Sequence, residues 1–246
     1  MSNRFSGTII REDLKNLKIV GHRGWPTRFP DNVLAGIEAA VTVADMVEVD
    51  IRASVDDVLV LSHDAVLGDL PVADTPWGVL SALDLGGGHG PVALQQLLAR
   101  FPDFPFNLEV KNYPGEPGFD PEHGLALRAA GLARPNDLLS CFFWPTMDAV
   151  RQPYPRVGTG LLVDAGGSLE DAVDHALAMG HVAVIPQWEL ALESGPAVRA
   201  AAESGLVVAV WTLNDPEQVI GLASLGVTAI ITDDPGRMRR ALQERT

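Results

Sequence analysis

The stretch from Met46 to Asp64 combines carboxylates and an imidazole with a strand-like pattern. Apolar and acidic residues alternate through Val47–Ile51, which is typical of a strand and puts Glu48 and Asp50 on one face. A hairpin turning at Asp56-Asp57 would place His63 opposite Asp50 on that face. Two carboxylates and an imidazole on one surface are what a metal-assisted hydrolase needs. A solvated hairpin face is the alternative interpretation.

A third carboxylate, Glu109, lies in a second strand-like run, Phe106–Lys111. If Glu48, Asp50 and Glu109 meet, their oxygen atoms suit Mg²⁺ or Ca²⁺ better than Zn²⁺. Without a cation the three carboxylates would repel one another, and at least one would stay protonated. The alternative is that Glu109 pairs only with Lys111 across the end of its strand.

Histidines and cations accompany these carboxylates. His22 and His63 are candidate acid–base groups, one to deprotonate an attacking hydroxyl and one to protonate a leaving alkoxide. Arg23 and Lys111 are candidate phosphate ligands, although they could also simply balance charge. Further candidates have a less specific signal. Phe142 and Trp211 could form apolar walls or pack in the core, His89 is expected to be a loop residue, and His123, His175 and His181 are expected to be solvated or packed.

Composition restricts the class of protein. The chain has 246 residues, of which 47% are hydrophobic, and a formal net charge of −14, which argues against nucleic-acid or anionic-membrane binding. The single cysteine, Cys141, excludes an internal disulfide and is expected to be a small core residue. Residues 1–18 lack the apolar segment of a secretory signal, and no window reaches the length of a membrane span. We therefore expect a cytoplasmic protein without stable membrane association.

Strand and helix patterns alternate along the chain and predict a single domain, residues 1–246, with an α/β fold. Strands are predicted within 18–24, 47–51, 106–111, 137–142, 156–164, 181–187, 206–213 and 227–232. Helices are predicted within 33–43, 92–101, 121–133, 146–151, 169–179, 196–204, 215–225 and from 234 onward, and either Asp31 or Asn32 could cap the first of them. Eight such units predict a (β/α)₈ TIM barrel, with 65–91 as an irregular insertion after the second strand that is either a lid or a connection.

The barrel prediction brings the candidates to one rim, because reacting residues of such barrels come from the C-terminal ends of different strands. The first three strands carry charged groups there, and the later strands carry mainly aromatic and neutral groups. The sequence therefore predicts a reactive half and a recognition half.

Several of these motifs, in this order, resemble the glycerophosphodiester phosphodiesterase family. They are His22-Arg23-Gly24, Pro30-Asp31-Asn32, Glu48-Val49-Asp50, Ser62-His63-Asp64, Leu108-Glu109-Val110-Lys111, Val210-Trp211-Thr212-Leu213-Asn214 and Ile230-Ile231-Thr232-Asp233-Asp234-Pro235. The resemblance implies a barrel that hydrolyses glycerophosphodiesters to glycerol 3-phosphate and an alcohol. By it, Glu48, Asp50 and Glu109 would hold a divalent metal, His22 and His63 would transfer protons, and Arg23 and Lys111 would bind the phosphate.

Two motifs depart from the family pattern, and they leave the preferred alcohol open. The family's Glu-Asn-Thr is Asp31-Asn32-Val33 here, and the run after Asp64 lacks the family's arginine. Two alternative functions remain: a phospholipase D-type hydrolase of lysophospholipids, and a barrel that binds phosphate without catalysis. The choice between Mg²⁺ and Ca²⁺ and the oligomeric state also stay open.

Overall fold

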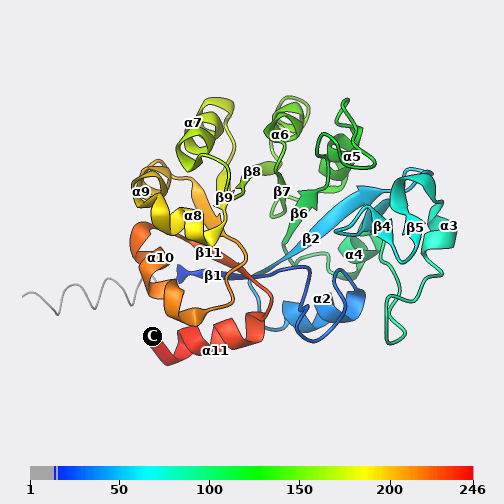
Figure 1. Cartoon of the computed structure of the whole chain (residues 1–246), viewed down its shortest axis with the longest axis horizontal. Helices are drawn as coiled ribbons and strands as arrows, with labels where there is room; N and C mark the ends of the chain where they lie inside the picture. Colours follow the sequence, from blue (N-terminus) through cyan, green and yellow to red (C-terminus); the bar gives the residue numbers. More distant parts are fainter. Residues whose placement is uncertain (1–13, 15, 246) are drawn as a thin grey trace, which may run out of the picture.

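Eight parallel strands close into a barrel in the computed structural model, which describes Leu14 and residues 16–245 (Figure 1). The order around the barrel is β1-β11-β10-β9-β8-β7-β6-β2, and β1 pairs with β2 to close it. The strands are β1 (Lys18–Gly21), β2 (Met46–Ala53), β6 (Phe106–Val110), β7 (Leu138–Cys141), β8 (Gly158–Val163), β9 (Ala183–Pro186), β10 (Val207–Val210) and β11 (Ala229–Thr232). The predicted TIM barrel is confirmed.

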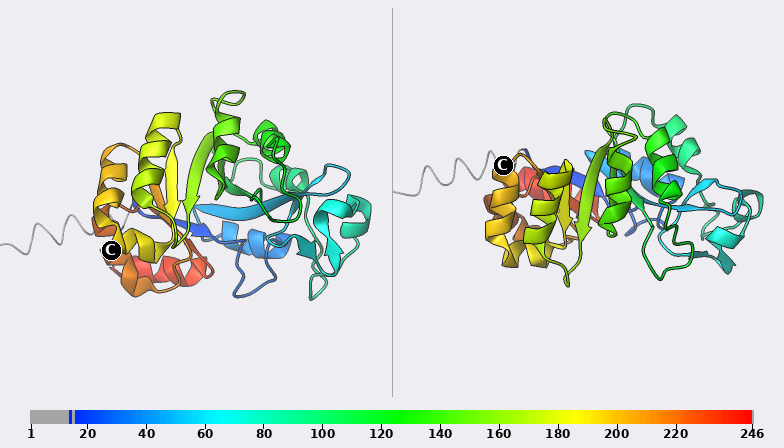
Figure 2. Two further views of the ribbon diagram at one scale, coloured as in Figure 1. Left: turned by 45° about the horizontal axis from the view of Figure 1, so that its top comes forward. Right: turned by 90° about the horizontal axis from the view of Figure 1, so that it is seen from above.

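A ring of helices covers the outside of the barrel (Figures 1 and 2). The helices that follow successive barrel strands are α2 (Leu34–Val41), α4 (Leu94–Arg100), α5 (Gly124–Leu132), α6 (Trp144–Arg151), α7 (Leu169–Met179), α9 (Gly195–Glu203), α10 (Val219–Leu225) and α11 (Pro235–Arg245). A short helix that the sequence did not predict, α8 (Trp188–Glu193), precedes α9, and the predicted helix start at Asp215-Pro216 is a 3₁₀ turn, η2 (Pro216–Gln218).

Side chains of each strand point alternately into the barrel and toward the helices, because the strand period is two. Ile19 and Ile230 pack in the outer core under the helices, while their neighbours Val20 and Ile231 fill the interior. Interior residues are small where strands crowd. A Cβ on Gly160, for example, would lie 3.0 Å from the Ile185 side chain. Cys141 is buried in the outer core as expected, and burial raises the pKa of its thiol to about 11.

The segment between β2 and α4 lies beside the barrel at the right of Figure 1. β3 (Leu59–Leu61) returns antiparallel to β2 outside the closed ring. The segment predicted to be irregular contains a small hairpin, β4 (Val66–Leu67) and β5 (Leu70–Pro71), then η1 (Val72–Asp74) and α3 (Trp77–Leu80). Val60, Val72 and Leu80 form its own small core. The prediction of an irregular insertion was therefore wrong in its details, because this segment has enough apolar residues to fold locally.

Neither suggested cap begins the first helix, α2. Its N-cap is Val33, which has no capping side chain, and Asn32 adopts a left-handed conformation with φ 59°. The Asn32 side chain is used elsewhere, as described below. Among the described residues, no helix is long and apolar enough to cross a membrane.

Candidate active site

Three buried carboxylates meet at the C-terminal end of the barrel. Asp50 of β2 is the register partner of Glu109 of β6, and Glu48 lies two residues before Asp50 on the same face. Their exposed fractions are 2% for Glu48, 1% for Asp50 and 8% for Glu109, and one oxygen of each lies within 4.8 Å of the others. The strand period and the parallel register are therefore enough to create the cluster that the sequence predicted.

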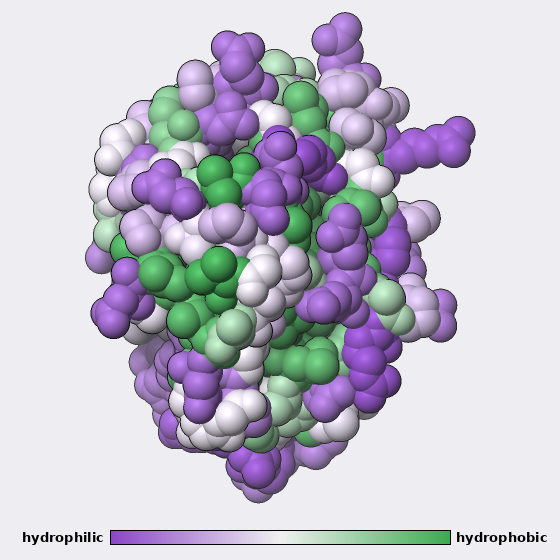
Figure 3. All heavy atoms as spheres, turned by 90° about the vertical axis from the view of Figure 1, so that its right-hand side faces the viewer, coloured by the Kyte–Doolittle hydropathy of each residue, from purple (hydrophilic) through white to green (hydrophobic). Residues whose placement is uncertain are grey.

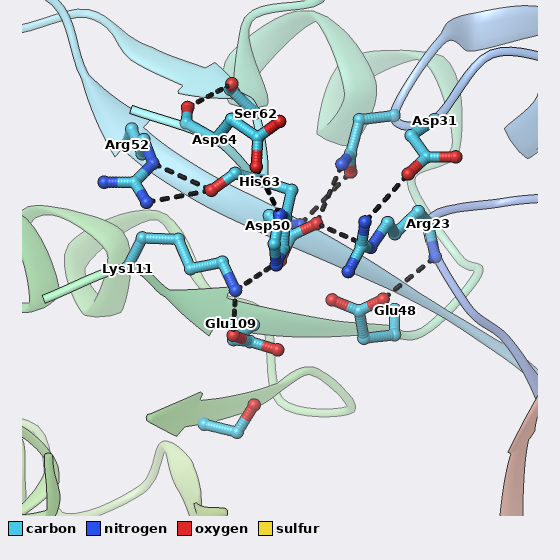
Figure 4. A network of polar contacts seen from close by, with 12 residues as sticks. Arg23, Asp31, Glu48, Asp50, Arg52, Ser62, His63, Asp64, Glu109 and Lys111 are labelled. Atoms are coloured by element: carbon cyan, nitrogen blue, oxygen red, sulfur yellow. Dashed lines mark hydrogen bonds and ion pairs between the residues drawn. The ribbon is translucent and has the colours of Figure 1, made fainter. Parts of the chain in front are cut away.

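Two cations approach the cluster from opposite sides (Figure 4). The Lys111 ammonium lies 3.0 Å from Asp50 Oδ1 and also contacts Glu109 Oε1. The Arg23 Nε lies 3.4 Å from Asp50 Oδ2, and its Nη1 lies 2.8 Å from Asp31. Glu109 thus pairs with Lys111, as the alternative interpretation held, but it does so inside the carboxylate cluster. With all three carboxylates ionised, the two cations would leave one negative charge uncompensated.

The three carboxyl groups have different proton affinities. Burial is the largest influence on Glu48, and together with the charges of Asp50 and Glu109 it raises the pKa of Glu48 well above its ordinary value. Burial also raises the pKa of Glu109, and Lys111 offsets part of this effect. For Asp50, burial is outweighed by Lys111, Arg23 and the Asn32 amide, so the pKa of Asp50 is lowered. Asp50 is the carboxylate that this environment keeps ionised.

The donor set fits a divalent cation. Glu48 Oε1 is buried and accepts no hydrogen bond from any described residue, a state that costs free energy unless a ligand compensates it. Carboxylate oxygens from two adjacent strands are hard ligands of the kind that Mg²⁺ and Ca²⁺ prefer. The unpartnered Glu48 Oε1 is therefore the observation that favours a cation between the three carboxylates.

His22 lies at the end of β1, in a turn that the sequence shapes tightly. Arg23 has φ 51° and Gly24 φ 94°, and a Cβ on Gly24 would lie 2.9 Å from the backbone of α2. This turn lets the Arg23 backbone N–H donate to Glu48 Oε2 at 2.9 Å. It also places His22 Nε2 4.0 Å from the same oxygen. The first strand end is thereby joined to the carboxylate cluster.

The partners of the His22 ring define its tautomer. Nδ1 lies 2.7 Å from Asp233 Oδ1, and Arg23 Nε donates to Nε2 at 3.2 Å. Since the carboxylate accepts and the guanidinium donates, Nδ1 carries the hydrogen and Nε2 presents a lone pair. His22, Arg23, Asp31 and Asp233 together line a surface cavity of about 340 Å³. Nε2 is therefore a proton acceptor next to both the carboxylates and an open cavity.

His63 reaches the site by a register that differs from the prediction. Ile51 pairs with Leu61, and the Ser62 N–H donates to the Asp50 carbonyl at 3.1 Å. Ser62, and not His63, is therefore opposite Asp50, because the pairing of β2 with β3 is shifted by one residue from the predicted register. The His63 imidazole still lies near enough to Asp50 for its charge to lower the carboxylate pKa (Figure 4).

The backbone of His63 is fixed by Arg52, the next residue on the same face of β2 after Asp50. Arg52 donates to the His63 carbonyl from Nε at 3.0 Å and from Nη2 at 2.8 Å, and Nη2 also pairs with Glu116. The His63 ring contacts Asp64 through Nδ1 at 2.8 Å, which leaves Nε2 on the other side of the ring. Glu48, Asp50 and Arg52, at every second position of β2, therefore contact the groups around the site: Glu48 accepts from the Arg23 backbone, Asp50 pairs with Lys111, and Arg52 holds the His63 backbone.

The two aromatic candidates lie together on the other half of the rim. Phe142 follows β7 and Trp211 follows β10, and their rings make an edge-to-face contact with centroids 5.3 Å apart. Both rings are half-buried on the interior core, and Trp211 Nε1 donates to the Ile185 carbonyl at 2.9 Å. This packing agrees with the core interpretation, and the rings also close the interior of the barrel below the rim.

Sequence reasoning missed four residues that hold the candidates in place. Asn32 donates to Asp50 Oδ2 at 2.8 Å and accepts from the Asp50 N–H at 3.2 Å. Asp233 orients His22 and is held in turn by Asn214, whose Nδ2 donates to Oδ2 at 2.6 Å. Arg52 is the fourth. Asn32, Asn214 and Asp233 all lie in the motifs quoted for the family, which was the signal that could have found them.

Comparison with known proteins agrees with this geometry. Residues 22–237 match the model of the glycerophosphoryl diester phosphodiesterase family. A glycerophosphodiester phosphodiesterase of Caldanaerobacter subterraneus is 25% identical and covers 88% of this chain and 94% of its own, and a human lysophospholipase D is 22% identical with 92% and 85% covered. The fold is shared with an Oleispira antarctica phosphodiesterase solved with its product sn-glycerol-3-phosphate, at a TM-score of 0.81 and 21% identity over 94% of this chain and 99% of that one. With a family match from the first site histidine almost to the C-terminus, this chain belongs to the glycerophosphoryl diester phosphodiesterase family and is a phosphoric diester hydrolase.

Proposed function

We propose that the chain is a metal-dependent phosphodiesterase that hydrolyses glycerophosphodiesters to glycerol 3-phosphate and an alcohol. Glu48, Asp50 and Glu109 hold Mg²⁺ or Ca²⁺, and Arg23 and Lys111 bind the phosphate. His22 and His63 transfer protons, and Phe142 and Trp211 line the substrate side of the rim. Family membership supports the reaction, and the observation that carries the metal is Glu48 Oε1, buried without a hydrogen bond in a cluster of three carboxylates.

Both histidines have Nδ1 held by a carboxylate, so Nε2 is the ring atom through which each would transfer a proton. His22 presents the Nε2 lone pair, because Asp233 holds its Nδ1–H, so His22 deprotonates the attacking hydroxyl. Asp64 holds Nδ1 of His63, so His63 would act as the acid in its doubly protonated form, giving the second proton from Nε2 to the leaving alkoxide. A divalent cation, when bound, would neutralise phosphate charge as a Lewis acid. Arg23 and Lys111 orient the phosphate oxygens beside it.

The direct test is release of glycerol 3-phosphate from glycerophosphocholine, with EDTA and after add-back of Mg²⁺ or Ca²⁺. We expect EDTA to abolish turnover and one of the two ions to restore it. His63→Ala should lose at least about 100-fold in kcat while it keeps the wild-type circular dichroism. His89→Ala, which replaces a loop histidine outside the carboxylate cluster, is the matched control. Undiminished turnover in EDTA would refute the metal role, and a fully active His63→Ala would refute that assignment.

One feature favours the lysophospholipid alternative. Val55, Val66, Val79 and Tyr113 are all about half exposed. Val66 belongs to β4, Val79 to α3, and the Val55 N–H donates to the Thr75 carbonyl between these elements, on the side where apolar groups appear among polar ones in Figure 3. An acyl chain could lie against such a surface, and one relative is named a lysophospholipase D.

Micellar lysophosphatidylcholine assayed beside glycerophosphocholine distinguishes the two substrates. If the lysophospholipid is the substrate, Val66→Asp and Val79→Asp should lower kcat/KM for it and leave glycerophosphocholine unaffected. Equal effects on both substrates, or no turnover of the micelles, would leave the soluble diester as the substrate. Calorimetric binding of glycerol 3-phosphate without turnover of either substrate would instead favour a non-catalytic phosphate-binding barrel.

A further inference from the structure

A second cluster of metal-ligating side chains lies outside the barrel, away from the carboxylate rim. Asp148 comes from α6, His175 from α7, and His181 from the connection between α7 and β9. The sequence suggested only solvated or packed roles for the two histidines. In the structure, both imidazoles direct Nε2 at the same carboxylate, and one ligand atom of each residue lies within 4.8 Å of the others.

We propose that Asp148, His175 and His181 form a binding site for a divalent transition metal ion, with Zn²⁺ as the best-fitting ion. Two imidazole nitrogens and one carboxylate oxygen are the ligands that Zn²⁺ takes in three-ligand sites, with water in the fourth position. The same set suits Mg²⁺ and Ca²⁺ poorly, because these ions prefer oxygen ligands. The two clusters of this protein therefore differ in the class of ion that they would select.

The two distances between the carboxylate and the imidazoles are close to those of a tetrahedral site. Asp148 Oδ1 lies 3.0 Å from His175 Nε2 and 2.9 Å from His181 Nε2, and Asp148 Oδ2 lies 3.1 Å from His175 Nε2. Zinc ligands at about 2.0–2.2 Å from the ion stand roughly 3.3 Å from one another. The carboxylate thus needs to separate from each imidazole by only a few tenths of an ångström to admit the ion, and the two imidazole nitrogens lie within 4.8 Å of each other.

A hydrogen bond to the second ring nitrogen already orients one of the proposed ligands, His181. His181 Nδ1 lies 2.7 Å from the Thr159 hydroxyl of β8, and both residues are buried. Metal-bound histidines commonly hold the second ring nitrogen in this way, since that hydrogen bond fixes the ring and directs the other lone pair at the ion. The Thr159 hydroxyl can donate or accept, so it serves the ring both with and without metal.

Access and position define what the site would do. His175 is 33% exposed and its ring is nearly parallel to that of His181, so an ion and its water can enter from solvent while His181 closes the inner side. α6 packs on α5 and α7 packs on α9, and Asp148 joins α6 to the α7–β9 connection between these helix pairs. A bound ion would link α6, which carries Asp148, to α7 and the α7–β9 connection, which carry the two histidines.

The test is metal binding by the full-length protein, with Mg²⁺ or Ca²⁺ present in excess to occupy the carboxylate rim. Co²⁺ titration followed by visible absorption, and Zn²⁺ titration followed by calorimetry, should each show one equivalent bound. Trp144 provides a local signal, because its ring centroid lies 5.5 Å from that of His175. Co²⁺ should quench tryptophan fluorescence in the wild type and not in Trp144→Phe.

The variants separate this site from the rim and from a simple hydrogen-bonded cluster. Asp148→Asn and His175→Ala should each weaken Zn²⁺ binding by more than about 100-fold, and Thr159→Val by about 10- to 100-fold. Asp174→Asn, an exposed neighbour on α7, and Glu48→Gln at the rim should retain it. Zn²⁺ should raise the Tm of the wild type and of these two controls, but not that of Asp148→Asn.

Two results would overturn the proposal. One is the absence of Co²⁺ and Zn²⁺ binding in the wild type under Mg²⁺, which would leave a His–Asp–His hydrogen-bond network only. The other is unchanged affinity in both Asp148→Asn and His175→Ala. If His175→Ala does not fold, Asp148→Asn alone decides, because it preserves the shape of the side chain. None of these readouts requires catalytic turnover.

Discussion

His22 Nδ1 lies 2.7 Å from Asp233 Oδ1, so the residue after the first barrel strand is held by the residue after the last. The contact joins positions 211 residues apart, and closure of the barrel through β1 and β11 brings them together. Burial alone would raise the pKa of Asp233, but the hydrogen bonds from His22 and Asn214 outweigh burial and lower it. Asp233 is thus an ionised group that positions a candidate base.

Asp233→Asn should lower kcat by roughly 100-fold with a smaller change in KM. Asn214 donates to Oδ2, so it would select the oxygen of the new amide and turn the amide nitrogen toward His22. Nδ1 would then have to accept, and Nε2 would carry the hydrogen, which is the wrong tautomer for a base. Steady-state kinetics across pH would show the lower kcat, and the low-pH side of the plot of kcat against pH would be displaced from that of the wild type.

Two further variants control for this effect. Asp103→Asn alters an exposed carboxylate on the α4–β6 connection, at the opposite end of the barrel, and should leave kcat unchanged. Asp233→Glu, which keeps the charge, should recover part of the activity. A wild-type pH profile in Asp233→Asn would contradict the positioning role.

Arg52→Lys tests whether the backbone of His63 must be held for catalysis. The guanidinium donates twice to the His63 carbonyl, and a lysine ammonium cannot reproduce that planar fork. We expect kcat to fall by roughly 10- to 100-fold, because small displacements of a reacting group are costly. Arg128→Lys, at an exposed pair with Asp57 on the same side of the molecule, should have no such effect. Equal kcat values for the two variants would show that Arg52 has only a structural role.

The barrel and the carboxylate cluster were predictable because both depend on short periods in the sequence. Alternation in β2 places Glu48 and Asp50 on one face, and the parallel register with β6 adds Glu109. Covered strands with apolar residues on both faces predicted the eight-unit alternation. These features are local, or they follow from the closure of a barrel.

The details that failed depend on single backbone conformations. Asn32 was an expected helix cap, but its left-handed backbone conformation directs its side chain to the site, where it donates to Asp50. One residue in the register of the β2–β3 hairpin placed Ser62, and not His63, opposite Asp50. Turn geometry and the long-range Asp233 contact leave no periodic pattern, so spacing alone could not have assigned them.

Lys111→Met should destabilise the metal-free protein and make its stability depend on cations. Lys111 is buried against Asp50 and Glu109, whose charges outweigh burial and raise its pKa. Removal of one partner from a buried ion pair typically costs about 3–5 kcal/mol of unfolding free energy. A divalent cation bound to the same carboxylates should restore part of this, because it binds only the folded state.

Thermal denaturation in EDTA and in excess Mg²⁺ or Ca²⁺ measures this effect. Lys18→Met, at an exposed position on β1, is the matched control and should give the wild-type Tm in both conditions. A Tm deficit for Lys111→Met that is equally large with and without cations would indicate that the lysine stabilises the fold independently of a cation site.

Binding of the cation at the rim should release protons, and its affinity should therefore rise with pH. The pKa of Glu48 is raised well above its ordinary value by burial and by its two acidic neighbours, so the metal-free protein holds a proton that a cation must displace. Asp50, whose pKa is lowered, is already ionised and contributes none. Since the metal-free state binds more protons than the metal-bound state, raising the pH through the elevated pKa favours binding.

Calorimetry of Mg²⁺ or Ca²⁺ binding in two buffers of different ionisation enthalpy counts the protons released. We expect a release that decreases as the pH rises, together with a tighter apparent Kd. Glu48→Gln should abolish most of the release, whereas His175→Ala, at the separate cluster on α6 and α7, should retain it. Proton release that is identical in Glu48→Gln and in the wild type would show that Glu48 is not the carboxyl group that the cation deprotonates.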